Sequence, residues 1–236
     1  MKLNVNIEYH TSWGEELVLC LSGRRYPLAY VGEGIWKGEI ARITLKNGAE
    51  YSYELVRDGQ TVRKEWKSHV LALPEGPAPK TLTINDRWND RPADAPFYSS
   101  AFTNAIFGRP AAKAAKAPKG TNVVLQVAVP TVRPNEVLAL AGSGKTLKDW
   151  GKVIPFDASQ YPVWTLALNV TEPFAYKLLV ADKETLTPIA WEDSENRWFA
   201  ALPQEDEVVV EADLQVRFNG RDWKGAGTAI PVFSLR

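Results

Sequence analysis

Four side chains in the second half of this 236-residue sequence have the types needed to bind a sugar ring. Trp150 and Trp191 stand in polar stretches rather than on apolar stripes, while Lys177 and Asn196 add a cationic donor and an amide. A pyranose ring has apolar C–H faces that pack on aromatic rings, and hydroxyls around its rim that need hydrogen-bond partners. The set therefore favours a saccharide ligand. The alternative is that each tryptophan is half-buried under a loop.

The expected strength of such a site follows from the area that it covers. Each indole stacked on a sugar face covers on the order of 100 Å², which is worth ~2–3 kcal/mol at the usual area coefficient. Two rings set at an angle suit a curved glucan better than a flat one. The sum corresponds to an affinity between about micromolar and millimolar.

A second motif in the same region, GKT at residues 144–146, is similar to the end of a nucleotide-binding P-loop. That loop needs a glycine five positions before the GKT glycine, where this sequence has Ala139, and a helix directly after the motif. Gly151 and Pro155 make a helix unfavourable there. The motif therefore predicts no nucleotide site, and Trp150 remains the residue to explain in this stretch.

The composition argues against several other kinds of site. Lys plus Arg and Asp plus Glu are both 28, so the formal net charge is zero and neither a nucleic acid nor an acidic membrane is expected as a partner. Cys20 is the only cysteine, which excludes an internal disulfide and a cysteine-rich zinc site. His10 and His69 are expected on polar strand faces without further ligands at metal spacing. We therefore expect no metal, no cofactor and no Ser/His/Asp catalytic site.

Most of the sequence alternates apolar and polar residues with period two, as half-buried antiparallel strands do. Helical periodicity is weak outside the Ala/Lys-rich stretch 110–120, which is typical of a linker. The predicted fold is all-β, with two antiparallel immunoglobulin-like β-sandwich modules joined by a linker. We place the first module at residues 1–90, the linker segment at 91–120 and the second module at 121–220.

The two modules repeat one another in their aromatic residues. The repeated pairs are Trp36 and Trp164, Tyr51 and Tyr176, and Trp66 and Trp191. The tyrosine pair and the Trp66–Trp191 pair are each separated by 125 residues. The first two pairs are in phase with aliphatic neighbours and are predicted to lie in the core, which leaves Lys177 pointing outward. The third pair makes Trp66 the candidate counterpart of Trp191.

The order of motifs in the second module resembles carbohydrate-binding module family 20, whose members are starch-binding domains. The matching motifs are GS…LKDW (142–150), a tryptophan opening a strand, YK (176–177) and WE…NR (191–197). The resemblance implies that the family's first binding site consists here of Trp150, Lys177, Trp191 and Asn196. Glu192 belongs to the same WE motif and is also a candidate contact. One departure is Lys148, which stands where the family usually has glycine.

The first module resembles the same family less closely. Its matching motifs are YxTxWGE (9–15), Trp36, and Trp66. Ser52 stands where the family's lysine is expected, and the loop after Trp66 is cut to WKS, so the resemblance implies a weakened first site.

Trp13 occupies a position where the family carries a ring of a second, separate site, and Tyr30 is its candidate partner. An ordinary loop aromatic is the alternative for both. In the second module Pro134 occupies the corresponding stretch. We therefore expect the modules to be complementary, with one site each.

The whole sequence is similar to the N-terminal part of an amylomaltase-type 4-α-glucanotransferase, in which two starch-binding modules precede a glycoside hydrolase family 77 barrel. Residues 86–102 and 223–236 carry this resemblance. It implies that 221–236 begin the barrel, whose catalytic carboxylates lie outside this sequence and which would be the partner of these modules. The expected function is non-catalytic binding of α-1,4-glucan, as in starch, glycogen or maltooligosaccharides, for an enzyme that transfers glucanyl groups.

Two other functions stay open, because β-sandwiches host many unrelated activities. The chain could be an interaction or dimerisation module without sugar binding in its first module, or it could be catalytic. The start of the sequence lacks the apolar core of a signal peptide, and no run approaches the ~18 apolar residues of a membrane span. These observations predict a cytoplasmic protein.

Overall fold

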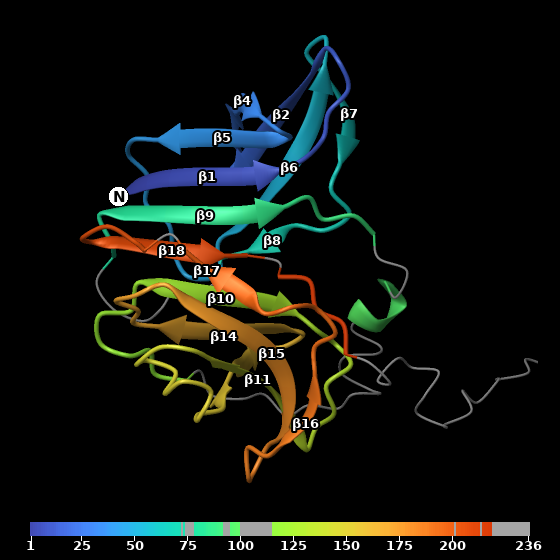
Figure 1. Ribbon diagram of the computed structural model, residues 1–236. Coiled ribbons are helices and arrows are strands. Elements are labelled where there is room, and N and C mark those ends of the chain that lie inside the picture. Colours follow the sequence, from blue (N-terminus) through green and yellow to red (C-terminus); the bar gives the residue numbers. More distant parts are fainter. Residues whose placement is uncertain are drawn as a thin grey trace, which may run out of the picture.

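The computed structural model describes residues 1–71, 73, 78–91, 95–99, 115–200, 202–212 and 214–218, and these form almost entirely β-structure (Figure 1). The first half contains β1 (Lys2–Glu8), β2 (Glu15–Leu21), β3 (Arg24–Pro27), β4 (Ala29–Gly32), β5 (Ile35–Ile40), β6 (Glu50–Arg57), β7 (Gln60–Lys64), β8 (His69–Val70) and β9 (Thr81–Arg87), followed by the 3-10 turn η1 (Ala95–Tyr98). The second half contains β10 (Val123–Ala128), β11 (Glu136–Gly142), β12 (Ile154–Pro155), β13 (Asp157–Gln160), β14 (Val163–Leu168), β15 (Phe174–Asp182), β16 (Pro188–Trp191), β17 (Arg197–Phe199) and β18 (Glu207–Glu211). The all-β prediction is confirmed. Much of the expected linker and all of 221–236 lie outside the described residues.

The second half repeats the strand pairing of the first. In the first half β1 pairs with β5 and β9, β2 with β3 and β6, and β6 with β7 and β8. In the second half β10 pairs with β14 and β18, β11 with β12 and β15, and β15 with β16 and β17. Each strand of the first half therefore has a counterpart in the second, and the two can be compared residue by residue.

The two halves share one eight-stranded sheet, which differs from the two separate antiparallel sandwiches that the sequence predicts. Its strand order is β13-β14-β10-β18-β9-β1-β5-β4, and Figure 1 shows its strands stacked from β4 at the top to β14 below. The three central pairings, β10–β18, β18–β9 and β9–β1, are parallel. Alternation of apolar residues indicates which face of a strand is buried but not which strand lies beside it, so this junction has no signature in the sequence.

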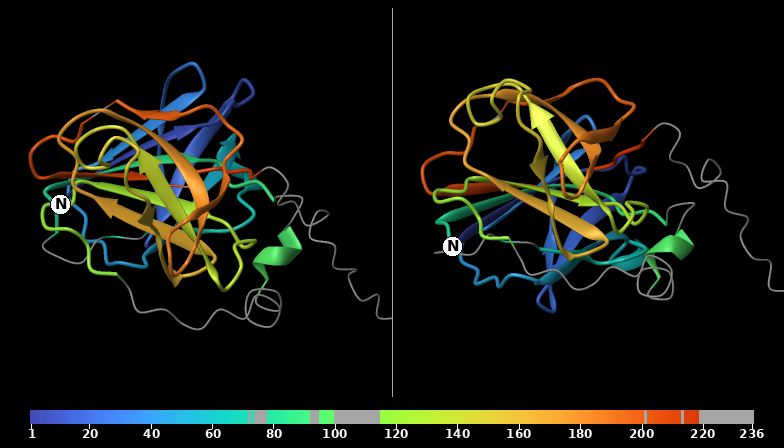
Figure 2. Two further views of the ribbon diagram at one scale, coloured as in Figure 1. Left: turned by 60° about the horizontal axis from the view of Figure 1, so that its bottom comes forward. Right: turned by 90° about the horizontal axis from the view of Figure 1, so that it is seen from below.

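The two smaller sheets pack on opposite faces of the shared sheet. On β18, Val208 and Val210 join the core of the first half, whereas Val209 joins that of the second. On β10, Val124 likewise faces the first half, and Val123 faces the second. Figure 2 shows the yellow and orange strands of the second half crossing one side of this sheet. The central strands are therefore buried on both faces, and they join the halves through hydrophobic packing as well as hydrogen bonds.

The predicted core aromatic residues are confirmed. Trp36 and Trp164 are buried at equivalent places, on β5 and β14, and each indole N–H donates to a backbone carbonyl: that of Tyr9 at 3.1 Å and that of Val129 at 2.8 Å. Tyr51 and Tyr176 are buried on the equivalent strands β6 and β15, and Lys177 points to the opposite face from Tyr176 (partly exposed).

A ladder of polar side chains beside Val209 crosses β1, β9 and β18, which are three of the four central parallel strands. Asn6 Nδ2 donates to Asn85 Oδ1 at 2.8 Å, and Asn85 Nδ2 donates to Glu211 Oε1 at 2.6 Å. Burial raises the pKa of the Glu211 carboxyl, and the Asn85 hydrogen bond and the Arg87 charge only partly oppose that shift. A carboxyl with a raised folded pKa binds its proton more tightly in the folded state. Stability therefore falls as pH rises from the unfolded pKa through the folded pKa.

We expect Glu211→Gln to raise the free energy of unfolding at about pH 8 by up to ~1 kcal/mol, because the amide still accepts from Asn85 without carrying a desolvated charge. The gain should vanish below the ordinary pKa of glutamate, where both forms are neutral. Urea unfolding at the two pH values measures this difference, with Glu195→Gln on an exposed loop as the control. A loss of stability at about pH 8 would contradict the assignment.

Candidate functional site

The outer face of β15 and the adjacent strand β16 carry two of the predicted site residues, Lys177 and Trp191. Leu179 on β15 pairs with Trp191 on β16, and Lys177 lies two residues from Leu179 on the same face. Residues in this diagonal arrangement have Cα atoms about 7–8 Å apart, within reach of long and aromatic side chains. The neighbouring strand β11 ends at Gly142, which pairs with Tyr176, and the loop that carries Trp150 begins there. The hydrogen-bond ladder thus brings three separate motifs to one edge of the second half.

The loop 143–151 is held in an unusual conformation that fixes Trp150. Lys148, Asp149 and Trp150 have φ of 52°, 44° and 67°, so three consecutive non-glycine residues are left-handed. The Trp150 amide donates to Gly142 O at 2.6 Å, and the Gly144 amide donates to the Asp149 carboxylate at 2.7 Å. Left-handed backbone costs such residues roughly 1–2 kcal/mol each, and strain of this kind gathers at functional sites.

The departure at Lys148 has a structural consequence, because glycine at this position would adopt the left-handed conformation without a Cβ penalty. We expect Lys148→Gly to stabilise the second half by up to ~1 kcal/mol, offset in part by the entropy of glycine in the unfolded chain. Thermal unfolding measures the gain, and glucan affinity should stay within about twofold. Lys152→Gly, just past the left-handed run, is the control that should destabilise or be neutral. Destabilisation by Lys148→Gly would show that the left-handed turn is not strained.

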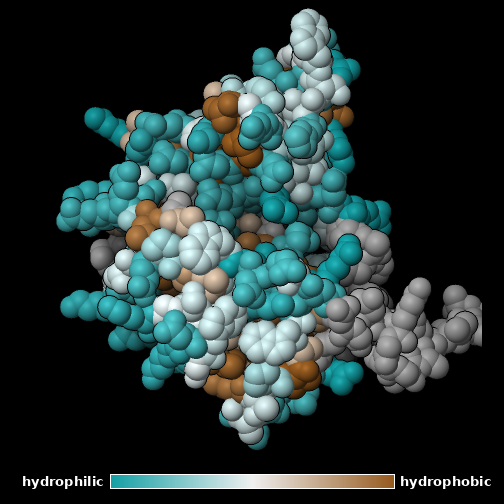
Figure 3. All heavy atoms as spheres, in the orientation of Figure 1, coloured by the Kyte–Doolittle hydropathy of each residue, from teal (hydrophilic) through white to brown (hydrophobic). Residues whose placement is uncertain are grey.

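The side chains of this site are open to solvent and have free hydrogen-bonding groups. Trp150 is 39% exposed, Trp191 is 41% exposed, and Asn196 is also exposed. In the part of the chain that the structure describes, none of these three residues nor Lys177 has a side-chain hydrogen bond or ion pair. Figure 3 shows a face that is mostly hydrophilic, with hydrophobic groups small and scattered.

The Glu192 side chain, which the sequence suggests as a ligand contact, is buried (3% exposed) and is bound within the chain. Its carboxylate accepts from the Leu178 amide at 2.7 Å and pairs with Arg197 through Nε at 3.0 Å and Nη2 at 2.7 Å. Burial lowers the pKa of Arg197, but the hydrogen bond and charge of Glu192 outweigh that effect and raise it overall. Glu192 therefore positions the strand end that carries Trp191 and the turn that carries Asn196.

Trp198 is a candidate contact that the sequence analysis missed. It is 65% exposed on β17 and pairs with Ala175, which lies two residues before Lys177 on the outer face of β15. Its neighbour Phe199 is buried, so the two side chains point to opposite faces of the sheet. The sequence signal was available, because Trp198 alternates with the apolar Phe199 after a polar turn.

The GKT motif at 144–146 binds carboxylates of the chain itself. The Lys145 amide donates to Glu172 Oε1 at 2.7 Å, and a Cβ on Gly144 would lie 3.0 Å from the same oxygen. No helix follows. The acidic side chains Glu172 and Asp149 thus take the place that phosphate oxygens have in a P-loop.

The first half has no counterpart of Trp150, Lys177 or Trp191 at the equivalent positions. Glu54 pairs with Lys64 on β7 as Leu179 pairs with Trp191, so Lys64 is the counterpart of Trp191. Lys64 Nζ binds Glu54 Oε1 at 2.8 Å. Ser52 takes the place of Lys177, and the Trp150 loop is reduced to the turn Ser22-Gly23.

Trp66 is therefore not the counterpart of Trp191, although 125 residues separate the two tryptophans, the same separation as between Tyr51 and Tyr176. The turn between β15 and β16 is longer than the one between β6 and β7, since Ala181 pairs with Pro188 where Val56 pairs with Thr61. Trp66 instead contacts Tyr98, with ring centroids 6.0 Å apart, at the junction of the two halves.

Trp13 lies in the turn between β1 and β2, and Tyr30 lies on β4. Trp13 is 99% exposed in the turn between β1 and β2, where Gly14 has φ of 80°. Tyr30 is 56% exposed, and its ring lies 5.3 Å from that of Trp36. The Trp36 indole N–H in turn donates to Tyr9 O, four residues before Trp13. Tyr30 thus lies near the segment that leads to Trp13.

The histidines do not form a metal centre in the described ranges. His69 is buried rather than on a polar face, with Nε2 at 2.8 Å from Glu65 and Nδ1 at 3.3 Å from Asp86. Glu65 accepts from the Tyr53 amide at 2.7 Å, as Glu192 accepts from Leu178, so Glu65 and His69 are the counterparts of Glu192 and Arg197. Within the described part of the chain, no group of three or more His, Cys, Asp or Glu side chains is arranged to hold a metal ion. Nor does any helix there have the length and apolar character to cross a membrane.

Comparison with known proteins finds a family model that matches part of the chain. Residues 120–211 match the starch binding domain family of carbohydrate-binding modules, so the resemblance stated from the sequence is confirmed for this segment. The chain is 26% identical, over 98% of its length, to a protein of Oryza sativa subsp. japonica named 4-alpha-glucanotransferase DPE2. It spans 27% of the length of that relative.

Two solved structures with low overall similarity to this chain come from an amylase and a glucoamylase. The family 20 module of the maltotetraose-forming amylase from Pseudomonas saccharophila is 16% identical, with a TM-score of 0.32 over 39% of this chain and 98% of that one. A family 15 glucoamylase from Hypocrea jecorina is 20% identical, with a TM-score of 0.34 over 43% of this chain and 18% of that one.

Proposed function

We propose that this chain binds α-1,4-glucan through Trp150, Lys177, Trp191 and Asn196, and the match of residues 120–211 to the starch binding domain family supports this. The observation that carries the proposal is the outer face of β15. Lys177 lies on this strand and the exposed Trp191 on the adjacent β16, and the loops that carry the exposed Trp150 and Asn196 adjoin the neighbouring strands β11 and β17. The indoles stack on the apolar faces of successive glucose units, and the ammonium and amide groups bind their hydroxyls.

We further propose that the chain serves as the non-catalytic N-terminal region of a cytoplasmic glucanotransferase. The supporting observation is the similarity of nearly the whole chain to the rice 4-alpha-glucanotransferase. In this role the modules hold an α-glucan close to a downstream catalytic barrel, which raises the effective concentration of the polymer there.

The first half contributes a different site in this proposal, formed by Trp13 and Tyr30. Trp13 is fully exposed and Tyr30 is 56% exposed, so both rings offer stacking area that the Lys64–Glu54 ion pair cannot offer. We expect Trp13→Ala to lower the number of β-cyclodextrin molecules bound per chain in calorimetric titration, while the affinity of the remaining site is unchanged. Val62→Ala, which truncates another exposed side chain of the first half, is the control. An unchanged stoichiometry after Trp13→Ala would limit glucan binding to the second half.

Titration of the chain with maltoheptaose, combined with gel filtration, tests the proposed function against its rival. Saturable binding at about micromolar to millimolar concentration supports it. A stable dimer without sugar binding would instead favour an interaction module, for which the altered first-half positions Ser52 and Lys64 would be the supporting feature.

A further inference from the structure

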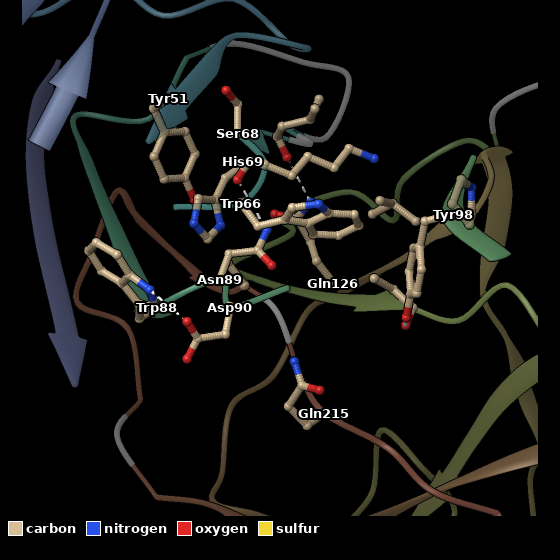
Figure 4. A pocket seen from close by; sticks show the side chains of 16 residues that line it. Tyr51, Trp66, Ser68, His69, Trp88, Asn89, Asp90, Tyr98, Gln126 and Gln215 are labelled. Carbon is tan, nitrogen blue, oxygen red and sulfur yellow. Dashed lines mark hydrogen bonds between the residues drawn. The ribbon is translucent and has the colours of Figure 1, made fainter. Parts of the chain in front are cut away.

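A cavity of about 310 Å³ lies where the two halves meet, away from the outer face of β15. Its lining includes Trp66, Asn89 and Tyr98 from the first half and the turn after it, and Gln126 and Gln215 from the second half. Figure 4 shows the Trp66 ring between Asn89 on one side and Tyr98 on the other. The volume is at the lower end of the range for small-molecule sites, about 300–1,000 Å³.

Gln126 gives the cavity an unsatisfied polar atom. The side chain is 4% exposed on β10, and its Nε2 donates to Val70 O at 3.1 Å. Its Oε1 is buried and has no hydrogen-bond partner in the described part of the chain. Turning the amide over would remove the Val70 bond and leave that carbonyl without its donor. Buried polar atoms in native proteins almost always have a partner, so a hydroxyl or a water supplies one here.

The charged side chains at the cavity are bound to partners within the chain or lie at the surface. His69 lies between Glu65 and Asp86, and Asp86 Oδ2 also accepts from Tyr51 OH at 2.8 Å. Asp90 pairs with Arg63 and accepts from the Trp88 indole N–H at 3.2 Å. Lys67 is exposed at the surface, where its charge is solvated. An ionic ligand would find no buried unpaired counter-charge among the described lining residues, so the cavity suits an uncharged ligand.

We propose that this cavity binds a neutral mono- or disaccharide, such as the end of a short maltooligosaccharide. The Trp66 and Tyr98 rings meet edge to face at 85°, so they offer two walls for the apolar faces of a sugar. The amides of Asn89 and Gln126 face the same space and bind its hydroxyls. This site is separate from the outer face of β15 and does not rest on glucan binding there.

The site exists only when the halves are together, because each contributes part of the lining. A ligand bound there therefore stabilises the junction formed by β9 and β18. A cyclic maltooligosaccharide is a closed ring much larger than this cavity, so it binds only at exposed sites, whereas maltose can enter.

The test uses the whole chain carrying Trp13→Ala and Trp191→Ala, so that binding at the exposed sites is weakened. In this background we expect saturable maltose binding, followed by tryptophan fluorescence, and maltose should raise the unfolding temperature. Adding Trp66→Phe or Gln126→Leu should weaken maltose binding at least tenfold. Adding Trp198→Ala, on the outer face of β15, should leave it unchanged.

Two outcomes would overturn the proposal. One is the absence of saturable maltose binding in the background variant. The other is binding that Trp66→Phe does not weaken in a chain whose near-ultraviolet circular dichroism matches the background. β-Cyclodextrin titration of the unmodified chain is run in parallel, because it reports only on the exposed sites. The two proposals can thus fail independently.

Discussion

Replacing Trp191 with alanine should weaken β-cyclodextrin binding by ~2 kcal/mol or more, about 30-fold, because one of the two stacking faces is lost. The indole is 41% exposed, so its removal opens no core cavity, and the unfolding temperature should change little. Isothermal titration calorimetry measures the affinity, and thermal unfolding of the same sample checks the fold.

The first half provides a matched control for this variant. Lys64→Ala truncates the residue at the equivalent register position, where the side chain binds Glu54 instead of a ligand. It should leave the affinity unchanged. Trp198→Ala should fall between the two if the exposed ring on β17 extends the site. Equal affinities for Trp191→Ala and the unmodified chain would rule out the outer face of β15 as the glucan site.

The sequence was sufficient to predict the fold class and the outward residues of the second half, for physical reasons that can be named. Period-two alternation identifies buried and exposed faces of single strands, which is why Trp164 and Tyr176 were correctly predicted as core and Lys177 as outward. Trp150 could be selected because a large ring in a polar, glycine-flanked loop has no core to enter. Its strained backbone was not visible, since a left-handed lysine leaves no pattern in a sequence.

The structure differs from the expectations where a residue's environment depends on partners far away in the chain. Glu192 lies beside an exposed tryptophan in sequence, but neighbouring residues of a strand face opposite sides, and Arg197 pairs with it in the interior. Trp66 was aligned by a constant separation, which the longer turn between β15 and β16 breaks. A separation of residues measures chain length, whereas equivalence in a sheet is set by register.

The shared sheet escaped prediction for a related reason. Val208, Val209 and Val210 form a continuous apolar run on β18, which is the pattern of a strand buried on both faces. That pattern favours a central position in a sheet that is covered on both sides. It does not say that the covering layers belong to different halves of the chain, as the separate cores on either side of β18 show.

The other large effect should come from Glu192→Ala, which we expect to destabilise the second half by about 3 kcal/mol or more. Removing one partner of a buried ion pair leaves the other partly buried and uncompensated, and the Leu178 amide also loses its acceptor. The Arg197 side chain is 22% exposed, so solvent recovers part of the cost and keeps the effect near the low end of the range.

Glu192→Gln separates the two contributions, because the amide oxygen can still accept from Leu178 but no longer carries the charge that Arg197 requires. Its effect on urea unfolding should lie between those of the alanine variant and the unmodified chain. Glucan affinity should fall in both variants in step with the loss of fold at the Trp191 and Asn196 turn. If Glu192→Ala weakened glucan binding while stability stayed unchanged, the carboxylate would be a ligand contact after all, and its buried position would not describe the bound state.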